Sequence, residues 1–277
     1  MNHWWRGLLI KKAWIYIVAL ISLILTLFPM LWIFTISIKT KQDAFSMPPV
    51  WNFTPIWDNY LNLLSNTNYT SSFRNSIVIT LVSVGLAILL GIPAAYSLNR
   101  LRLAGRNAIS LLLLLSYMFP EFLFSIPLYV LYQKLGLYDT QIALALTYQC
   151  VTLPFAIWLL RGFFQGVPVE LEDAALIDGC TRFSTLWRVY LPLSAPGIAA
   201  TAVLAAIWVW NELTIALSLT YSNAQTITVA MAGFRGYASI DWGGMAAGSI
   251  IAIVPMLIFA IFAQKYIVEG LTLGAVK

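Results

Sequence analysis

Charge is scarce in this 277-residue chain. Asp, Glu, Lys and Arg together make up 10% of the residues, whereas a soluble domain carries about 25%. Hydrophobic residues make up 60%, and the mean hydropathy is +0.82. The shortage of charge excludes an ordinary soluble enzyme and indicates an integral membrane protein.

Histidine and cysteine are nearly absent as well. The single histidine is His3, so catalysis by histidine or a metal site is not expected. Cys150 and Cys180 fall on an expected span and an expected loop, and they indicate neither a disulfide nor a metal. The chain also lacks the G-x-x-x-x-G-K-[ST] phosphate loop. We therefore predict that this chain is not an enzyme and binds no ATP, other cofactor or metal by itself.

Long apolar runs are abundant. Six are long enough to cross a bilayer, which takes roughly 20 residues each. They are Ala13–Ile38, Phe73–Leu98, Asn107–Leu131, Gln141–Phe163, Leu191–Leu217 and Met245–Gln264. The first run is too long for a signal peptide and no small-residue cleavage site follows it, so we expect an uncleaved span. The sequence predicts an all-α integral membrane protein with six transmembrane helices.

The distribution of Lys and Arg predicts the orientation. With the N-terminus inside, 11 of these residues fall on the cytoplasmic side and 5 outside, which accounts for all 16. Both termini are then cytoplasmic, and the net charge of +5 reflects topology and not nucleic-acid binding. The expected parts of the single domain 1–277 are outer loops 39–72 and 222–243, a cytoplasmic loop 165–190 and a cytoplasmic tail 265–277.

One expected cytoplasmic stretch is rich in acidic residues: four carboxylates fall between Glu170 and Asp178, in VELEDAALIDG. Pro168 suits the first turn of a helix, and the carboxylates favour the positive end of its dipole. Gly179 suits a left-handed end of that helix. Thr181 suits the cap of a second helix. We predict a short helix, a sharp turn and a second short helix; the simplest alternative is a solvated connector.

The spacing in this stretch matches a known pattern. That pattern is E-A-A, three residues, G, nine residues, I, one residue and L-P, and it is fitted by Asp173, Ala174, Ala175, Gly179, Val189, Leu191 and Pro192. Asp173 replaces Glu and Val189 replaces Ile, which keeps the charge and the shape. The chain thus resembles the permease subunits of binding-protein-dependent ABC importers, which implies a place in a bacterial inner membrane. Further stretches, among them VWNELTIALSL and the tail VEGLTLGAVK, resemble the sugar-importer branch, the MalG-like permeases.

The resemblance implies a mechanism and a set of partners. In such importers the EAA helix docks into a cleft on a cytoplasmic ATPase, so it implies ATPase-coupling roles for Glu172, Asp173, Ala174, Ala175, Asp178 and Gly179. ATP and Mg would be bound by two partner ATPase subunits, and the tail Gly270–Lys277 would also reach them. A second homologous permease would complete the path, which fits the lack of an internal repeat here. An external solute-binding protein would deliver the sugar, which crosses by alternating access.

Polar residues within the spans mark a candidate substrate path, since ionisable groups at membrane depth usually face a cavity or a partner. The candidates are Glu121, Trp208, Asn211 and Glu212, followed by Tyr117, Tyr148 and Gln149. Aromatic faces beside hydrogen-bonding groups suit a sugar. The alternative for Glu212 is that it packs against the partner permease or holds a helix bend. The outer loop 222–243 resembles the segment that reaches into the binding protein, which implies contact through Phe234, Arg235 and Tyr237.

Two other functions stay open at this stage. Within the importer class, the solute could be a polyamine or a glycerol phosphate. From another class, an ion-coupled secondary transporter would use Glu121 and Glu212 as proton carriers. The EAA spacing argues against this second possibility, because a self-sufficient carrier needs no ATPase dock.

Overall fold

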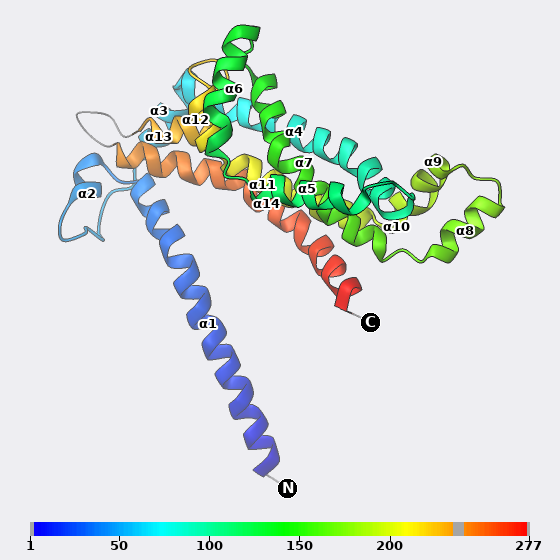
Figure 1. Cartoon of the computed structure of the whole chain (residues 1–277). Coiled ribbons are helices and arrows are strands. Elements are labelled where there is room, and N and C mark those ends of the chain that lie inside the picture. Colours follow the sequence, from blue (N-terminus) through cyan, green and yellow to red (C-terminus); the bar gives the residue numbers. More distant parts are fainter. Residues whose placement is uncertain (1–2, 235–240, 276–277) are drawn as a thin grey trace. The chain divides into compact units, whose positions relative to one another are not determined.

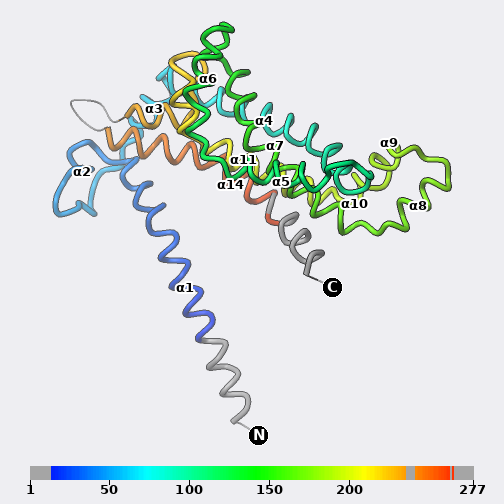
Figure 2. Tube along the Cα trace, viewed as in Figure 1, coloured from blue at the N-terminus to red at the C-terminus, as the bar shows by residue number. Residues whose placement is uncertain are grey.

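The structure is a computed structural model that describes the backbone of residues 3–234 and 241–275 (Figure 2). Side chains are described for residues 14–234, 241–262 and 264. Four continuous helices contain stretches long and apolar enough to cross a membrane: α1 (His3–Ser37), α4 (Thr67–Arg100), α7 (Gln141–Gln165) and α14 (Trp242–Ala275). Two bent helix pairs raise the number to as many as six. The helical membrane architecture expected from the sequence is confirmed.

The described residues form two compact units, 1–66 with 233–252 and 67–232 with 253–277. In the first unit, α2 (Lys41–Phe45) and α3 (Asp58–Ser65) follow α1. The buried Nζ of Lys39 donates a hydrogen bond to the Val50 carbonyl at 2.7 Å and lies 4.7 Å from the centre of the Phe53 ring. The expected outer loop 39–72 is therefore an ordered segment, and its last residues already belong to α4.

The second unit is a helical bundle built around α4, α7 and α11 (Ala195–Asn211), with α5 (Arg106–Met118) against α7 (Figure 1). Close approach of α7 and α11 depends on Gly197, because a Cβ there would lie 2.3 Å from the Phe163 ring. At one end of this bundle α12 (Thr214–Leu219) packs on α6 (Phe122–Leu135), and α13 (Ile227–Ala232) packs on α4. The opposite end carries α8 (Val169–Ile177) and α9 (Arg182–Thr185).

Two of the expected spans are broken. The run Asn107–Leu131 divides into α5 and α6, which meet at 92°. Pro120 explains the break, since it disfavours helical geometry in the residue before it, and Phe119 is extended with φ −71° and ψ 133°. The run Leu191–Leu217 is likewise not one helix: α11 ends at Asn211, Glu212 is extended with φ −66° and ψ 131°, and α12 follows.

The acidic stretch folds as the sequence predicts. Pro168 precedes α8, and Gly179 ends it with φ +87°. The Gly179 N–H donates to the Leu176 carbonyl at 3.1 Å and the Cys180 N–H to the Ala175 carbonyl at 2.9 Å, which closes the helix end. The Thr181 hydroxyl then accepts the Ser184 N–H at the start of α9.

After α9 the chain forms a π-helix, η1 (Leu186–Tyr190), and the short α10 (Leu191–Leu193). The Leu191 N–H donates to the Leu186 carbonyl, five residues back. Pro192 accounts for the wide turn, because a proline lacks an N–H and its ring clashes with the carbonyl four residues earlier. At the other end of the chain, α14 continues to Ala275, so the expected tail 265–277 is helical where the structure describes it.

Candidate functional site

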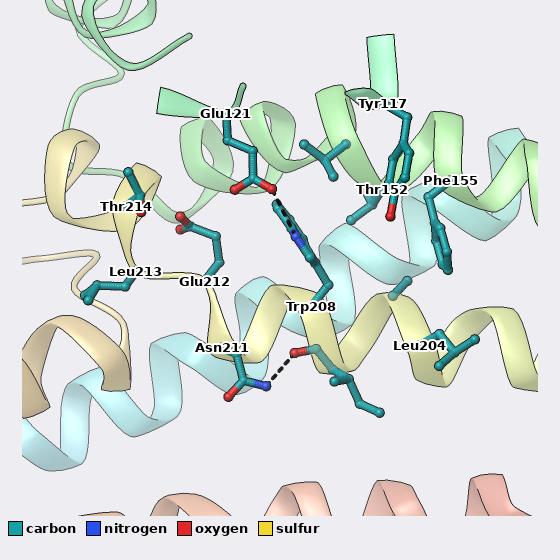
Figure 3. Close-up of a pocket in the computed structure, with 13 residues that line it drawn as sticks. Tyr117, Glu121, Thr152, Phe155, Leu204, Trp208, Asn211, Glu212, Leu213 and Thr214 are labelled. Carbon is teal, nitrogen blue, oxygen red and sulfur yellow. Dashed lines mark hydrogen bonds between the residues drawn. The ribbon is translucent and has the colours of Figure 1, made fainter. Parts of the chain in front are cut away.

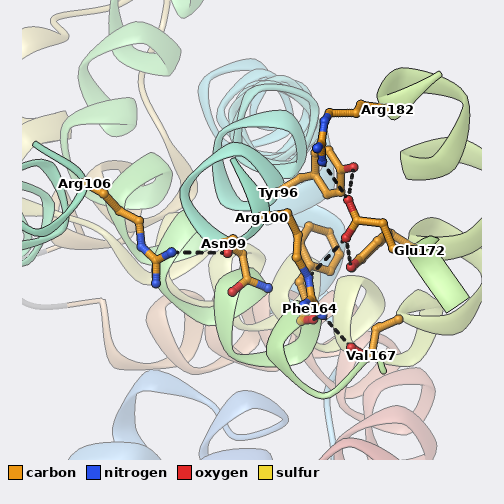
Figure 4. A network of polar contacts seen from close by, with 9 residues as sticks. Tyr96, Asn99, Arg100, Arg106, Phe164, Val167, Glu172 and Arg182 are labelled. Atoms are coloured by element: carbon orange, nitrogen blue, oxygen red, sulfur yellow. Dashed lines mark hydrogen bonds and ion pairs between the residues drawn. The ribbon is translucent and has the colours of Figure 1, made fainter. Parts of the chain in front are cut away.

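The carboxylates of the acidic stretch divide into one buried group and an exposed set. Glu172 is 4% exposed. Its Oε1 accepts a hydrogen bond from the Tyr96 hydroxyl at 3.0 Å and from Arg182 Nη1 at 3.1 Å. Its Oε2 accepts the Tyr190 hydroxyl at 2.7 Å and lies 3.5 Å from Arg100 Nε. Figure 4 shows Tyr96 and Arg100 of α4 and Arg182 of α9 converging on Glu172.

The other predicted coupling residues lie on the outside of α8. Asp173, Ala174 and Asp178 are exposed, and Ala175 is half-buried. Gly179 is exposed and turns the chain away. Ile177, 86% exposed, lies beside these small and acidic residues. This outer surface is open to another molecule, whereas Glu172 points into the protein.

A second candidate site is a cavity of about 590 Å³ within the second unit. Its lining comes from α5, α7, α11, the start of α12 and the two helix breaks: Tyr117, Glu121, Val151, Thr152, Phe155, Leu204, Ala205, Ile207, Trp208, Asn211, Glu212, Leu213 and Thr214. Trp208 Nε1 donates a hydrogen bond to Glu121 Oε1 at 3.2 Å. Figure 3 shows Glu121, Glu212 and Trp208 turned toward the same space. The cavity therefore gathers all four predicted path residues, together with Tyr117.

Glu212 also holds the break in the helix. Its Oε1 accepts the Ile215 N–H at 2.6 Å, and its Oε2 accepts the Ala216 N–H at 3.0 Å and the Tyr148 hydroxyl at 2.8 Å. The carboxylate thus caps α12 and satisfies N–H groups that a helix start leaves unpaired. Tyr148 is fully buried and faces Glu212, whereas Gln149 donates to the Ser83 carbonyl of α4.

Asp139, between α6 and α7, is a functional candidate that the sequence reasoning missed. Its carboxylate accepts the backbone N–H groups of residues 221 to 224, at 2.9 to 3.1 Å. Burial raises the pKa of this carboxyl, but the four N–H groups lower it by more, so the pKa lies below its ordinary value. Its backbone is left-handed, with a φ of +59°, a conformation that Asp tolerates. The sequence alone gave no signal for this role. Asp139 fixes the start of the loop after α12.

Asn75 of α4 holds the same loop. Its Nδ2 donates to the carbonyls of Asn223 and Gln225 at 2.8 and 3.1 Å, and its Oδ1 accepts Gln141 Nε2 at 2.7 Å. Of the predicted binding-protein contacts, Phe234 is half-buried, while Arg235 and Tyr237 lie outside the described residues. Within the described part of the chain, no group of three or more His, Cys, Asp and Glu side chains is placed to hold a metal ion.

A bundle with broken spans, an open cavity at the breaks and an exposed small-residue helix at one end defines a membrane transport subunit. Residues 87–272 match the family described as binding-protein-dependent transport system inner membrane component. The chain belongs to this family, whose members are membrane components of ABC importers and not their catalytic subunits.

Relatives extend the similarity to nearly the whole chain. The trehalose transport system permease protein SugB of Mycobacterium tuberculosis is 39% identical over 257 residues, covering 91% of this chain and 92% of the relative. The trehalose/maltose transport system permease protein MalG of Thermococcus litoralis is 36% identical over 280 residues, covering 98% and 99%. The fold matches a chain of a bacterial ABC transporter involved in the import of the acidic polysaccharide alginate, with TM-score 0.78, 23% identity and coverage of 96% and 98%.

Proposed function

We propose that this chain forms half of the membrane path of an ABC importer for a sugar or an oligosaccharide. The observation that carries the proposal is the near-full-length similarity to two permeases whose names give trehalose or maltose as their solute. The aromatic side chains of Tyr117, Phe155 and Trp208 line the cavity beside Glu121. Such a lining, mostly apolar with a few polar groups, suits the mixed surface of a sugar.

The outer surface of α8 is the proposed dock for a cytoplasmic ATPase. Asp173, Ala174, Ala175, Asp178 and Gly179 would form the contact, because small side chains allow close approach and carboxylates can pair with basic groups. ATP and Mg would be bound by two ATPase subunits, and hydrolysis would take place there. A second, homologous permease would supply the other half of the path.

The proposed orientation rests on the distribution of Lys and Arg. With α8 on the cytoplasmic side of the inner membrane, the loop after α12 would face outward, and we propose the outer loop 222–243 as the dock for a solute-binding protein. Phe234, Arg235 and Tyr237 are the proposed contacts. Both termini are then cytoplasmic, as the distribution of Lys and Arg indicates.

Reconstitution of the chain with its cognate permease, ATPase and binding protein in proteoliposomes tests the proposal. We expect uptake of at least one radiolabelled sugar from a panel of trehalose, maltose and N,N′-diacetylchitobiose, dependent on ATP inside the vesicle and insensitive to a protonophore. Uptake of spermidine or glycerol 3-phosphate in place of every sugar would reassign the solute. Uptake that needs no ATPase but stops with the protonophore would establish an ion-coupled carrier instead.

The dock is tested separately by adding bulk to it. Ala174→Arg and Gly179→Trp should each abolish co-purification of the ATPase and ATP-dependent uptake, while the chain still inserts into the membrane. Ser65→Arg, which adds an equal charge at an exposed position of α3, serves as the control for co-purification. If the ATPase stays bound to both α8 variants, this surface is not the dock.

A further inference from the structure

If an ATPase docks on α8, a contact must carry the movement of α8 to the transmembrane helices. Along the chain α8 adjoins α9 and η1, its closest packing partners in the second unit. Among the residues that the structure describes, Glu172 is the one member of α8 whose side chain makes hydrogen bonds or ion pairs. Two of its partners, Tyr96 and Arg100, belong to the transmembrane helix α4.

The partners of Glu172 are themselves tied together. The Tyr96 and Tyr190 rings pack edge to face with centroids 5.0 Å apart, and the Arg100 guanidinium lies 5.4 Å from the Tyr190 ring. Arg100 Nη2 also donates to the carbonyls of Phe164 and Val167, at the end of α7 (Figure 4). The helix α4, the end of α7 and the segment η1 therefore share one network of charged and polar groups with Glu172.

Such a network is stiff for two reasons. Hydrogen bonds to an ionised carboxylate are shorter and stronger than those between neutral groups. In addition, the site is buried, so a partner that moved away would leave a charge without compensation and water could not readily replace it. Displacing Glu172 is therefore expected to displace Tyr96 and Arg100 with it.

We propose that Glu172 is the joint that transmits movement of α8 to α4, and through Arg100 to the end of α7. This inference rests on the proposed docking of an ATPase on the outer surface of α8. It assigns Glu172 a positioning role that differs from docking: Asp173 and its exposed neighbours meet the ATPase, whereas Glu172 passes their displacement into the membrane. The cavity lined by α7 and α11 is where that displacement would take effect.

A reporter in the cavity makes the inference testable without knowing the solute. In a chain with Cys150 and Cys180 replaced by serine, Leu213→Cys places a single thiol on the cavity wall. The probe is fluorescein maleimide, applied to the complex with its ATPase in nanodiscs. The measured quantity is the ratio of labelling rates with and without ATP and Mg, alongside ATP hydrolysis and the amount of ATPase bound.

In the reporter chain we expect the ratio of labelling rates to differ from one. In Glu172→Gln we expect this ratio to return to about one, while bound ATPase and ATP hydrolysis are retained. Glu170→Gln, an exposed change two residues earlier on the same helix, should keep the reporter ratio. Tyr96→Phe removes a single hydroxyl on the α4 side of the joint and should bring the ratio of labelling rates part of the way toward one.

Three outcomes overturn the inference. An unchanged ratio in Glu172→Gln shows that movement reaches the cavity by another route. Loss of bound ATPase together with the ratio shows that Glu172 serves docking or folding alone. If Glu172→Gln does not insert, Tyr96→Phe decides, and an unchanged ratio there is equally decisive. By contrast, a reporter chain that binds no ATPase, or whose ratio is one throughout, refutes the proposed function itself.

Discussion

The hydroxyl of Tyr148 donates a hydrogen bond of 2.8 Å to Oε2 of Glu212, and both side chains are buried. This contact links the middle of α7 to the gap between α11 and α12. The gap needs such a link, because the same carboxylate holds the N–H groups of Ile215 and Ala216. The position where a span breaks is therefore also a position where the bundle is fastened.

Removing this carboxylate should destabilise the protein. For Glu212→Ala we expect a loss of about 3–6 kcal/mol, since hydrogen bonds to a charged group contribute roughly 1.5–3 kcal/mol each and two N–H groups lose their acceptor. Tyr148→Phe removes one hydrogen bond to the same carboxylate and should cost about 1.5–3 kcal/mol. Melting temperatures in detergent measure both, and Asn211→Ala, at the exposed neighbouring position, should change stability by less than about 0.5 kcal/mol. A melting temperature of Glu212→Ala equal to that of Asn211→Ala would refute the capping role.

The cavity predicts a specific loss of transport. Trp208→Ala should lower uptake of the transported sugar about tenfold, because about 1.4 kcal/mol of lost contact corresponds to that factor. Trp208→Phe keeps an aromatic face and should retain most of the uptake. Trp158→Ala is the matched control, since Trp158 is 62% exposed and does not line this cavity. The assignment of the cavity as a sugar path fails if Trp208→Ala and Trp158→Ala transport equally well.

Asp139 predicts a dependence of stability on pH. Because its pKa in the folded protein lies below the ordinary value of 3.8, the ionised carboxylate stabilises the fold above the unfolded pKa. This contribution is lost as the pH falls through the folded pKa. Asp139→Asn keeps a side chain that tolerates the positive φ, so it removes the charge with little backbone strain.

At neutral pH we expect Asp139→Asn to lower stability by about 1.5–3 kcal/mol, the range for hydrogen bonds to a charged group. The difference in melting temperature from the unaltered protein should shrink as the pH is lowered below about 4. Melting curves between pH 7 and pH 3 measure this. A difference that stays constant over the whole range would show that the charge of Asp139 plays no part.

Packing at Gly197 predicts a steric effect. Gly197→Ala places a methyl group 2.3 Å from the Phe163 ring, so either this ring or the two helices α7 and α11 must shift. We expect a loss of about 1–3 kcal/mol, as for other overpacked sites. Gly85→Ala, on α4 with nothing within 4 Å of the added Cβ, should be neutral or stabilising by about 0.5–1 kcal/mol. Equal melting temperatures for the two variants would contradict the close contact.

Much of this architecture could be predicted from local sequence. Apolar length located the candidate spans, and Gly179 and Thr181 marked the end of one short helix and the start of the next. These signals work because each depends on a few neighbouring residues and on the solvent around them. The break in the third span was missed because hydropathy averages over a window and does not register that Pro120 interrupts the helix. For the fifth span, a helix bend held by Glu212 was one of the alternatives, and the chain is extended at that residue.

The site was predictable as a set of residues but not as an arrangement. Spacing brought Glu172 and Asp173 into one segment with one expected role, yet the structure turns one inward and the other outward. Asp139 and Asn75 were missed because the groups that they bind are backbone atoms far away in sequence. No local pattern reports such pairings, which depend on how the whole bundle packs.

The π-helix η1 fixes how many residues separate α9 from α10. A residue of an α-helix advances about 100° around the axis, so the extra residue of a π turn rotates everything after it relative to a regular helix. Tyr190 ends that turn and reaches Glu172, and Pro192 lies two residues further on. The number of residues between Gly179 and Pro192 therefore fixes the direction of the Tyr190 side chain. Deleting one residue of η1 before Tyr190 would keep every side chain that contacts Glu172, yet it would turn the Tyr190 hydroxyl away from that carboxylate.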